Sequence, residues 1–397
     1  MEGKIGLDQA FEIIDRSVRR LPVETAEVTL AGGRVLAERV SAWVDVPGAD
    51  ISALDGWALR SAEAAAAGAR LKTAGVSSFS APFEGMAPAG SCVKVFAGSV
   101  VPDGLDAVAG DEIAQEQAEE VVVREPVPPG RGLRKKADEF RVGEAVAERG
   151  IELTPGWISF LIAAGWAEVK TVRLPRARVI AVGDEILPPG RALSPGEVYP
   201  SAASGIVAWL RMIGITDVRL NLVADDQLDI QEAVPRPHEA DVVITLGGTG
   251  MSDRDVVIAA LTELGVEFPF RGITARPGHY TAFGLKDGAP VICLPGGPSG
   301  AEMMFQLLVR RAVYSLMGMP GRGLPVQWAE LAADVKAGAE ADRLARVRLE
   351  RGSGTAVAVP LADKGIHRGI AEADGILRVR AGETSTKGDQ VEIWIIK

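Results

Sequence analysis

The chain has 397 residues, 47% of them hydrophobic, so it holds enough apolar material for more than one buried core. Its formal net charge is −10 and its pI is near 5.1. This acidic balance argues against a nucleic-acid binder, which usually carries a basic stripe. The two cysteines, Cys92 and Cys293, lack CxxC spacing, so neither a disulfide framework nor a cysteine zinc site is expected.

The sequence pattern predicts neither a signal peptide nor a membrane-spanning segment. No apolar run reaches membrane-spanning length, and acidic residues occupy the N-terminus where a signal peptide would be basic and then apolar. We therefore expect a soluble, cytoplasmic protein with no membrane or nucleic-acid partner.

The first 45 residues predict a helix followed by short elements. Residues 6–20 place Leu7, Ala10, Phe11, Ile14 and Val18 on one helical face. Residues 23–30 alternate as a strand does, and residues 34–40 fit a second short helix. A helix at 154–164 and a strand at 166–172 predict that residues 141–172 are a compact connector rather than a linker, and we group 1–45 with 141–176 as one connector domain.

Between the two halves of the connector, residues 46–140 predict a small β-domain. Pro47-Gly48 and Asp55-Gly56 indicate a loop ending in a hairpin turn, and runs at 91–97, 106–109 and 120–124 fit strands. The basic group Arg131, Arg134, Lys135 and Lys136 stands out in an acidic chain. It fits a solvated charged loop or a loop facing an anion.

Residues 177–320 alternate strands with helices, which predicts a doubly wound α/β domain with a parallel sheet. Expected strands are 179–182, 218–223, 241–246 and 290–294, and expected helices are 204–213, 226–234, 255–264 and 301–317. Ligands of such sheets bind outside the carboxyl ends of the strands. Glu185, Asp225, Asp226, Asp253, Asp255 and the turn at 295–300 all fall at those ends.

The stretch 241–255 combines a buried strand, the glycines Gly247, Gly248 and Gly250, and the start of a helix. This layout lets an anion approach backbone N–H groups, and the neighbouring carboxylates suggest a metal ion beside it. A structural explanation competes, because Ser252 and Asp255 also fit a capping box, as do Ser299 and Glu302. After a Gly/Pro hinge at 320–325, short alternating runs predict an all-β domain over 321–397.

Eight motifs in this order resemble the molybdopterin molybdotransferase family, which includes bacterial MoeA and the gephyrin E domain. They cover nearly the whole chain: Pro-Gly-x-Asp-x-Ser-Ala-Leu-Asp-Gly-Trp-Ala at 47–58, Pro-x-Gly-x-Asp-Ala-Val at 102–108, the basic-acidic loop at 131–139, Val-Gly-Asp-Glu at 182–185, Asp-Asp at 225–226, Gly-Gly at 247–248 with Asp255, Arg-Pro-Gly at 276–278 and Leu-Pro-Gly-x-Pro at 294–298.

The resemblance implies a four-part protomer with an elongated connector domain, and it implies that two protomers form a homodimer. The expected enzyme takes adenylylated molybdopterin and molybdate (or tungstate), releases AMP with the help of Mg²⁺, and leaves the metal on the pterin dithiolene. The resemblance also implies an active cleft between the α/β domain of one subunit and other domains of its partner, and possibly an interaction with the molybdopterin adenylyltransferase. By the family's motifs, Asp55, Glu185 and Asp255 are candidate catalytic residues, and Glu185, Asp226 and Asp255 are candidate metal ligands. Candidate binding residues are Gly247, Gly248, Ser252, Arg276, Gly296, Ser299 and Arg134.

Several positions depart from the family pattern. The usual Lys-Pro-Gly-Lys-Pro is Arg276-Pro-Gly-His279-Tyr280, and the asparagine of Leu-Pro-Gly-Asn-Pro is Gly297. Arginine keeps the charge with a different shape, and histidine is only partly charged near neutral pH. Three functions therefore remain open: a divergent molybdotransferase, a non-catalytic molybdopterin-binding carrier, chaperone or sensor, and an enzyme acting on a related nucleotide or pterin.

Overall fold

The computed structural model describes residues 4–236, 238–248, 256–350, 352, 354–361 and 365–397. The chain forms two compact units. The larger unit takes Met1–Glu24, Gly33–Val35 and Thr171–Lys397, and the smaller takes Thr25–Gly32 and Leu36–Lys170. The chain passes between them within β1 (Val23–Glu27), after Gly32 and Val35, and within β12 (Glu168–Val172).

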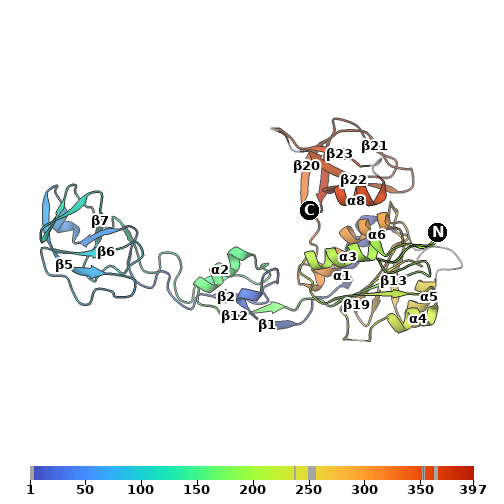
Figure 1. Cartoon of the computed structure of the whole chain (residues 1–397), viewed down its shortest axis with the longest axis horizontal. Coiled ribbons are helices and arrows are strands. Elements are labelled where there is room, and N and C mark those ends of the chain that lie inside the picture. Colours follow the sequence, from blue (N-terminus) through green and yellow to red (C-terminus); the bar gives the residue numbers. More distant parts are fainter. Residues whose placement is uncertain (1–3, 237, 249–255, 351, 353, 362–364) are drawn as a thin grey trace. The chain divides into compact units, whose positions relative to one another are not determined.

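The smaller unit contains the predicted β-domain, drawn in blue in Figure 1. Its six-stranded sheet has the order β7-β4-β6-β5-β9-β8, and only β5 and β6 pair in parallel. Gly56 allows β4 and β7 to meet closely, because a Cβ there would lie 2.2 Å from the carbonyl oxygen of Ala109. The strands are β4 (Gly56–Leu59), β5 (Ala69–Ser77), β6 (Ser91–Val95), β7 (Ala107–Gly110), β8 (Ala114–Gln117) and β9 (Glu120–Val123).

The rest of the smaller unit packs around α2 (Pro155–Ala163), whose predicted start is confirmed: the Thr154 side chain accepts the Trp157 N–H at 3.4 Å. The helix predicted at 34–40 is wrong. The N–H groups of Leu36 and Ala37 instead donate to the carbonyls of Ile151 and Lys170, so a helical ladder cannot form. The remaining elements are η1 (Val28–Leu30), η2 (Ser61–Ala64), and two strand pairs, β2 (Val40–Ser41) with β11 (Ala145–Ala147) and β3 (Ile51–Ser52) with β10 (Leu133–Arg134).

The predicted α/β fold is confirmed in the larger unit, around a six-stranded sheet of order β14-β13-β15-β19-β18-β16. Its first four strands are parallel, as expected, whereas β18 and β16 are antiparallel additions that the sequence did not reveal. The strands are β13 (Ala177–Val182), β14 (Val218–Val223), β15 (Val242–Leu246), β16 (Glu267–Arg271), β18 (Ala282–Lys286) and β19 (Ala289–Leu294).

Helices cover both faces of this sheet (Figure 1). On one face lie α3 (Ser201–Met212) and the predicted long helix, which runs as α6 (Pro298–Met304), a π-helical turn η3 (Phe305–Val309) and α7 (Arg310–Leu316). On the other lie α4 (Gln227–Ala233) and α5 (Val256–Glu263).

The amino-terminal helix α1 (Leu7–Ser17) joins the same core as α6 and α7. Leu7, Ala10 and Ile14 are fully buried there, and Asp15 forms an ion pair with Arg311 of α7. Although its sequence position suggested the connector domain, the apolar face of α1 is buried within the larger unit.

The C-terminal part of the larger unit is a closed barrel, because β22 pairs with both β23 and β24. Its strands are β20 (Val326–Leu331), β22 (Asp342–Glu350), β23 (Val357–Pro360), β24 (Gly375–Val379) and β26 (Gln390–Ile395). The short β17 (Ala275–Arg276) adds to β22, and β21 (Val335–Lys336) pairs with β25 (Thr384–Ser385). The barrel also carries a helix, α8 (Ile366–Glu372), so the expectation of an all-β domain was incomplete.

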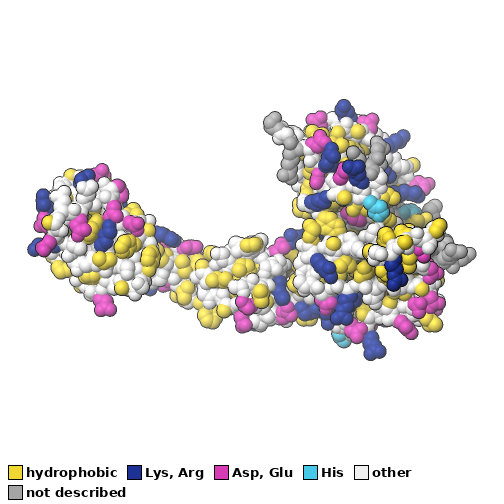
Figure 2. Space-filling view, in the orientation of Figure 1, with side chains coloured by type: hydrophobic (Ala, Val, Ile, Leu, Met, Phe, Trp, Pro, Cys, Tyr) yellow, Lys and Arg dark blue, Asp and Glu magenta, His cyan; other side chains and the backbone are white. Residues whose placement is uncertain are grey.

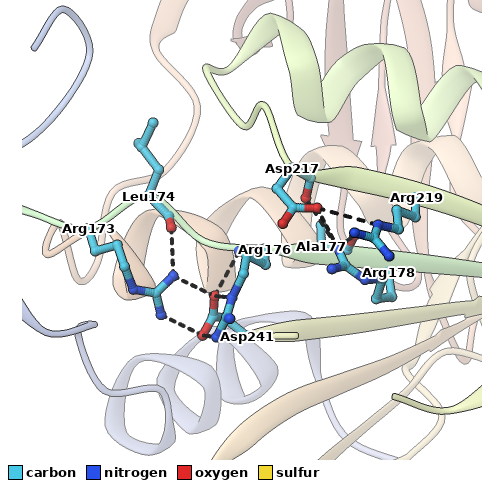
Figure 3. A network of polar contacts seen from close by, with 8 residues as sticks. All are labelled: Arg173, Leu174, Arg176, Ala177, Arg178, Asp217, Arg219 and Asp241. Carbon is cyan, nitrogen blue, oxygen red and sulfur yellow. Dashed lines mark hydrogen bonds and ion pairs between the residues drawn. The ribbon is translucent and has the colours of Figure 1, made fainter. Parts of the chain in front are cut away.

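A polar network anchors the amino ends of the sheet strands (Figure 3). Asp241 receives hydrogen bonds from the guanidinium groups of Arg173 and Arg176 and from the Arg176 backbone N–H. Its side chain is 8% exposed. Burial opposes ionisation, but the hydrogen bonds and charges of the two arginines outweigh it and hold the Asp241 pKa well below its usual range.

In the part of the chain that the structure describes, no helix is both long and apolar enough to cross a bilayer. On the face shown in Figure 2, basic and acidic side chains are interspersed over the barrel and the α/β domain. On this face, therefore, the charges do not form a broad basic patch.

Candidate functional site

A cavity of about 800 Å³ lies at the carboxyl ends of the four parallel strands; we call it the strand-end cavity. Each of these strands contributes a following loop to its wall: Glu185 after β13, Asp225 after β14, Gly247 and Gly248 after β15, and Pro295 and Gly296 after β19. The cavity therefore lies where ligands of parallel α/β sheets bind.

Glycine is required where these loops meet. Gly247 has φ +96°, and a Cβ at this position would lie 2.3 Å from the carbonyl oxygen of Val182. A Cβ on Gly296 would in turn lie 3.2 Å from the Gly247 Cα. Backbone rather than side chains thus forms this part of the wall, so a ligand can approach main-chain N–H groups.

Asp225 and Asp226 follow β14, and their carboxylates have different structural roles. Asp226 is the N-cap of α4, and its side chain accepts the N–H groups of Leu228 and Asp229 at 2.9 and 3.2 Å. Asp225, not Asp226, is in the cavity wall, together with Glu185. The structure therefore gives the predicted metal ligand Asp226 a capping role and brings its neighbour to the site.

A second cavity of about 720 Å³ adjoins the first, and we call it the basic cavity. The two share Tyr280, Pro295, Gly297 and Pro298 in their walls. The basic cavity is also lined by Arg276, Lys336 and Arg343, and among the described residues none of these three has a carboxylate within ion-pair distance. Three unneutralised cations in one hollow favour an anionic ligand.

Arg346 ties the barrel to α6 in the wall of the basic cavity. Its guanidinium forms an ion pair with Glu302 at 2.7 Å and donates to the side chain and carbonyl of Ser299 at 3.0 and 2.7 Å. The predicted capping box of Ser299 and Glu302 is therefore wrong, since α6 starts after Gly297 with Pro298 in its first turn. The side chains of Ser299 and Glu302 instead accept hydrogen bonds from the Arg346 guanidinium.

His279 is neutral in this arrangement. Its Nδ1 lies 3.0 Å from the carbonyl oxygen of Ile273, and its Nε2 lies 2.6 Å from the ammonium of Lys4. A carbonyl only accepts and an ammonium only donates, so Nδ1 carries the proton and Nε2 is the acceptor. Burial first, and then the charge of Lys4, lower the His279 pKa. His279 therefore adds no positive charge to the basic cavity.

Two predicted residues, Asp55 and Arg134, belong to the smaller unit. Asp55 is exposed, and its Oδ1 accepts the Ala97 N–H at 2.8 Å, which fixes the carboxylate orientation. Arg134 pairs with Glu139 at 3.5 Å, Lys135 with Asp50, Lys136 with Asp45 and Arg131 with Glu125. Every cation of the predicted basic loop thus has an acidic partner, which favours the charged-loop explanation.

The remaining predicted residues, Ser252 and Asp255, lie outside the described residues. Within the described ranges, no three potential metal ligands cluster. Glu185 and Asp225 nevertheless supply two carboxylates to one cavity, and Mg²⁺ is often held by one or two carboxylates together with substrate phosphates and water. The oxygen donors present thus suit this ion.

Several wall residues were not predicted from the sequence: Lys336, Arg343, Arg346 and His367, all from the barrel. The arginines of β22, set among apolar residues, resemble those of an ordinary partly solvated strand. Only the barrel's position beside α6 places them at a site.

Comparison with known proteins agrees with this geometry. Residues 178–314 match the model of a probable molybdopterin binding domain, residues 5–165 the MoeA N-terminal region (domain I and II), and residues 329–396 the MoeA C-terminal region (domain IV). The fold and cavities thus define a multi-domain protein built around an α/β domain of the molybdopterin-binding type.

The molybdopterin molybdenumtransferase of Haemophilus influenzae is 30% identical over 75% of this chain and 74% of its own length. Molybdopterin molybdenumtransferase 2 of Mycobacterium tuberculosis is 27% identical over 93% of this chain and 94% of its own. A crystal structure of the molybdopterin biosynthesis MoeA protein from Pyrococcus horikoshii matches with a TM-score of 0.83, 27% identity and 99% coverage of both chains. The chain belongs to the MoeA family of molybdopterin molybdenumtransferases.

Proposed function

We propose that this protein acts in molybdenum cofactor biosynthesis as a molybdopterin molybdenumtransferase, taking adenylylated molybdopterin and molybdate or tungstate and releasing AMP. The observation that carries the proposal is the pair of adjoining cavities. The strand-end cavity offers backbone glycines and carboxylates, and the basic cavity offers cations that no described carboxylate neutralises. The first suits a pterin phosphate with its metal ion, and the second suits an oxyanion.

Under this proposal the shared wall around Tyr280 and Pro298 is where the dithiolene meets the oxyanion. Arg276, Lys336 and Arg343 neutralise and orient the oxyanion, because within the described ranges none of the three is paired with a carboxylate. Arg346 is held by Glu302 and Ser299, so it keeps the barrel wall in place.

We also propose that Mg²⁺ binds at Glu185 and Asp225, with Asp255 as a further candidate ligand. When bound, Mg²⁺ offsets the phosphate charge that develops as the phosphoanhydride bond breaks. Gly247, Gly248 and Gly296 leave room for the phosphates to reach backbone N–H groups. Asp55, with one oxygen fixed by Ala97 and the other facing solvent, is proposed as a reacting group on the smaller unit of a homodimer.

The test is AMP release from adenylylated molybdopterin with Mg²⁺ and either molybdate or tungstate. Asp55→Asn is expected to lower AMP release by about 100-fold or more, the scale of a lost acid–base group, while pterin binding stays nearly unchanged. The matched control is Asp103→Asn, an exposed aspartate of the same unit without a hydrogen-bonded partner among the described residues. Unchanged turnover in Asp55→Asn contradicts the role of Asp55, and tight pterin binding without any AMP release contradicts the proposed activity.

Oxyanion-binding measurements distinguish the basic cavity from the basic loop at 131–136 in the smaller unit. Arg276→Gln should weaken molybdate binding and flatten its salt dependence, because Arg276 has no acidic partner in the part of the chain that the structure describes. Arg134→Gln should leave both unchanged, since Arg134 is already paired with Glu139. Equal effects of the two substitutions contradict the assignment of the basic cavity to the oxyanion.

A further inference from the structure

A third cavity lies in the larger unit, apart from the two cavities of the proposed active site. It has a volume of about 120 Å³ and is formed by α1, the helix from η3 to α7, the hinge at 322–324 and β26. None of its lining residues lines the strand-end cavity or the basic cavity. The lining combines arginines with aromatic and aliphatic side chains, which the proposed transfer reaction does not use.

Arg310 is the central charged group of this cavity. Its Nη1 donates to Gln306 Oε1 at 2.8 Å, its Nη2 donates to the Tyr314 hydroxyl at 3.0 Å, and its guanidinium lies over the Tyr314 ring at 5.7 Å. Among the described residues, no carboxylate lies within ion-pair distance of Arg310. The neighbouring Arg311 differs, because Asp15 neutralises it. Arg310 thus keeps its full positive charge in a half-buried position.

Two buried donors beside this charge lack partners. Gln306 is 1% exposed, and neither its Nε2 nor the buried Nε of Arg310 has a hydrogen-bond partner among the residues that the structure describes. The amide orientation of Gln306 is fixed, because arginine can only donate and so must face Oε1. Buried N–H groups are rarely left unpaired, so these two donors indicate a missing acceptor. The π-helical turn that carries Gln306 is a distortion frequently found at functional sites.

The remaining walls are apolar. Phe11 and Trp394 form an edge-to-face pair with ring centroids 6.3 Å apart, and Leu307 and Leu324 line the same space. A ligand must therefore combine an acceptor for a guanidinium and an amide N–H with a small hydrocarbon body. A phosphate dianion fits less well than a monoanion, because its hydration is costly to remove against apolar walls.

We propose that this cavity binds a small carboxylate with an apolar body, with the carboxylate received by Arg310 and Gln306. The shared chemistry occurs in a free short-chain or aromatic acid and in the C-terminal residue of a peptide with an apolar side chain. The proposal does not depend on the transfer reaction, because none of its residues belongs to the two active-site cavities.

The test measures binding by calorimetry on the full chain. The probes are isovalerate and benzoate, their neutral amides, inorganic phosphate, and a tripeptide ending in leucine as free acid and as amide. The acids are expected to bind at least about tenfold more tightly than the amides, the scale of one charge-assisted hydrogen bond. Binding of the free acids alone identifies a metabolite site, and tighter binding of the peptide acid identifies a chain terminus.

Three variants assign the binding to this cavity. Arg310→Met should weaken it by about tenfold or more, and Gln306→Leu should weaken it through loss of the amide donor. Arg310→Lys keeps the charge but loses the planar fork, so it should also bind more weakly and serves if Arg310→Met does not fold. Arg16→Met, an exposed arginine of α1, is the matched control with the same change in net charge. Amides that bind as tightly as acids, phosphate as the only binder, no binding at all, or full affinity in both Arg310 variants would each overturn the proposal.

Discussion

Replacing Asp241 by asparagine should be among the most destabilising single-atom changes in the larger unit. The carboxylate receives hydrogen bonds from two arginines and one backbone N–H at the start of β15 (Figure 3). Asparagine keeps one acceptor oxygen and turns an NH₂ group toward the guanidiniums. Breaking a buried charge pair costs about 3–5 kcal/mol. Because Arg173 and Arg176 are 25% and 33% exposed and can recover some hydration, we expect about 3 kcal/mol.

For a unit of this size, that loss corresponds to a fall in the unfolding midpoint of about 6–12 °C. Scanning calorimetry measures it, and the smaller unit provides an internal reference. The matched control is Asp217→Asn in the same network (Figure 3). Asp217 is 41% exposed and pairs with Arg178 and the largely exposed Arg219, so its loss should cost only about 1 kcal/mol. A shift for Asp241→Asn no larger than that for Asp217→Asn would refute the reasoning.

The same variant has a defined pH dependence. The folded-state pKa of Asp241 lies below its unfolded value, so its contribution to stability is complete above the unfolded pKa and is lost as the pH falls toward the folded pKa. The stability difference between wild type and Asp241→Asn should therefore be full at pH 7 and shrink below about pH 4. A constant difference across this range would mean that the cost comes from altered packing and not from the lost charge.

Three further outcomes are expected. Burial raises the pKa of both Cys92 and Cys293 to about 12, so neither thiol should react with a thiol-specific reagent until the protein unfolds; fast labelling of the native protein would contradict this. Gly247→Ala should destabilise the larger unit by about 1–3 kcal/mol, because the new side chain strains the backbone, and it should weaken pterin binding. Unfolding and binding measurements on this variant check the two effects. Arg346→Met should cost about 3–5 kcal/mol by leaving Glu302 buried and unpaired, whereas the double variant with Glu302→Leu should regain much of that loss; equal stability of the two variants would contradict the pairing.

The sequence predicted the parallel part of the sheet because β13, β15 and β19 contain apolar runs followed by glycine turns, whereas β14 alternates between apolar and polar residues. It missed β16 because Pro269 argues against a strand; the structure allows it because β16 lies at the sheet edge, where a proline need not donate. At the candidate site, too, the local sequence was not sufficient for a correct prediction. With Asp225 and Asp226 adjacent, no local pattern decides which carboxylate caps α4 and which lines the cavity.

The barrel cations show a second limit. Arg343 and Arg346 belong to β22, and the mixture of arginines and apolar residues in this strand is typical of a partly solvated strand. The contacts of Arg346 with Ser299 and Glu302 depend on how the barrel packs against α6, and a sequence pattern carries no information on that packing.

The burial of α1 also determines the order in which the chain can fold during synthesis. Asp15 and its partner Arg311 are separated by 296 residues, and the smaller unit is encoded between them. At about 5–20 residues per second, the ribosome reaches α7 roughly 15–60 s after it has made α1. Throughout that interval the apolar face of α1 has no core to enter, while the smaller unit can already complete its own. The apolar face of α1 therefore stays exposed to chaperones until α7 has been made, and deleting α1 would remove a late-docking part of the α/β core.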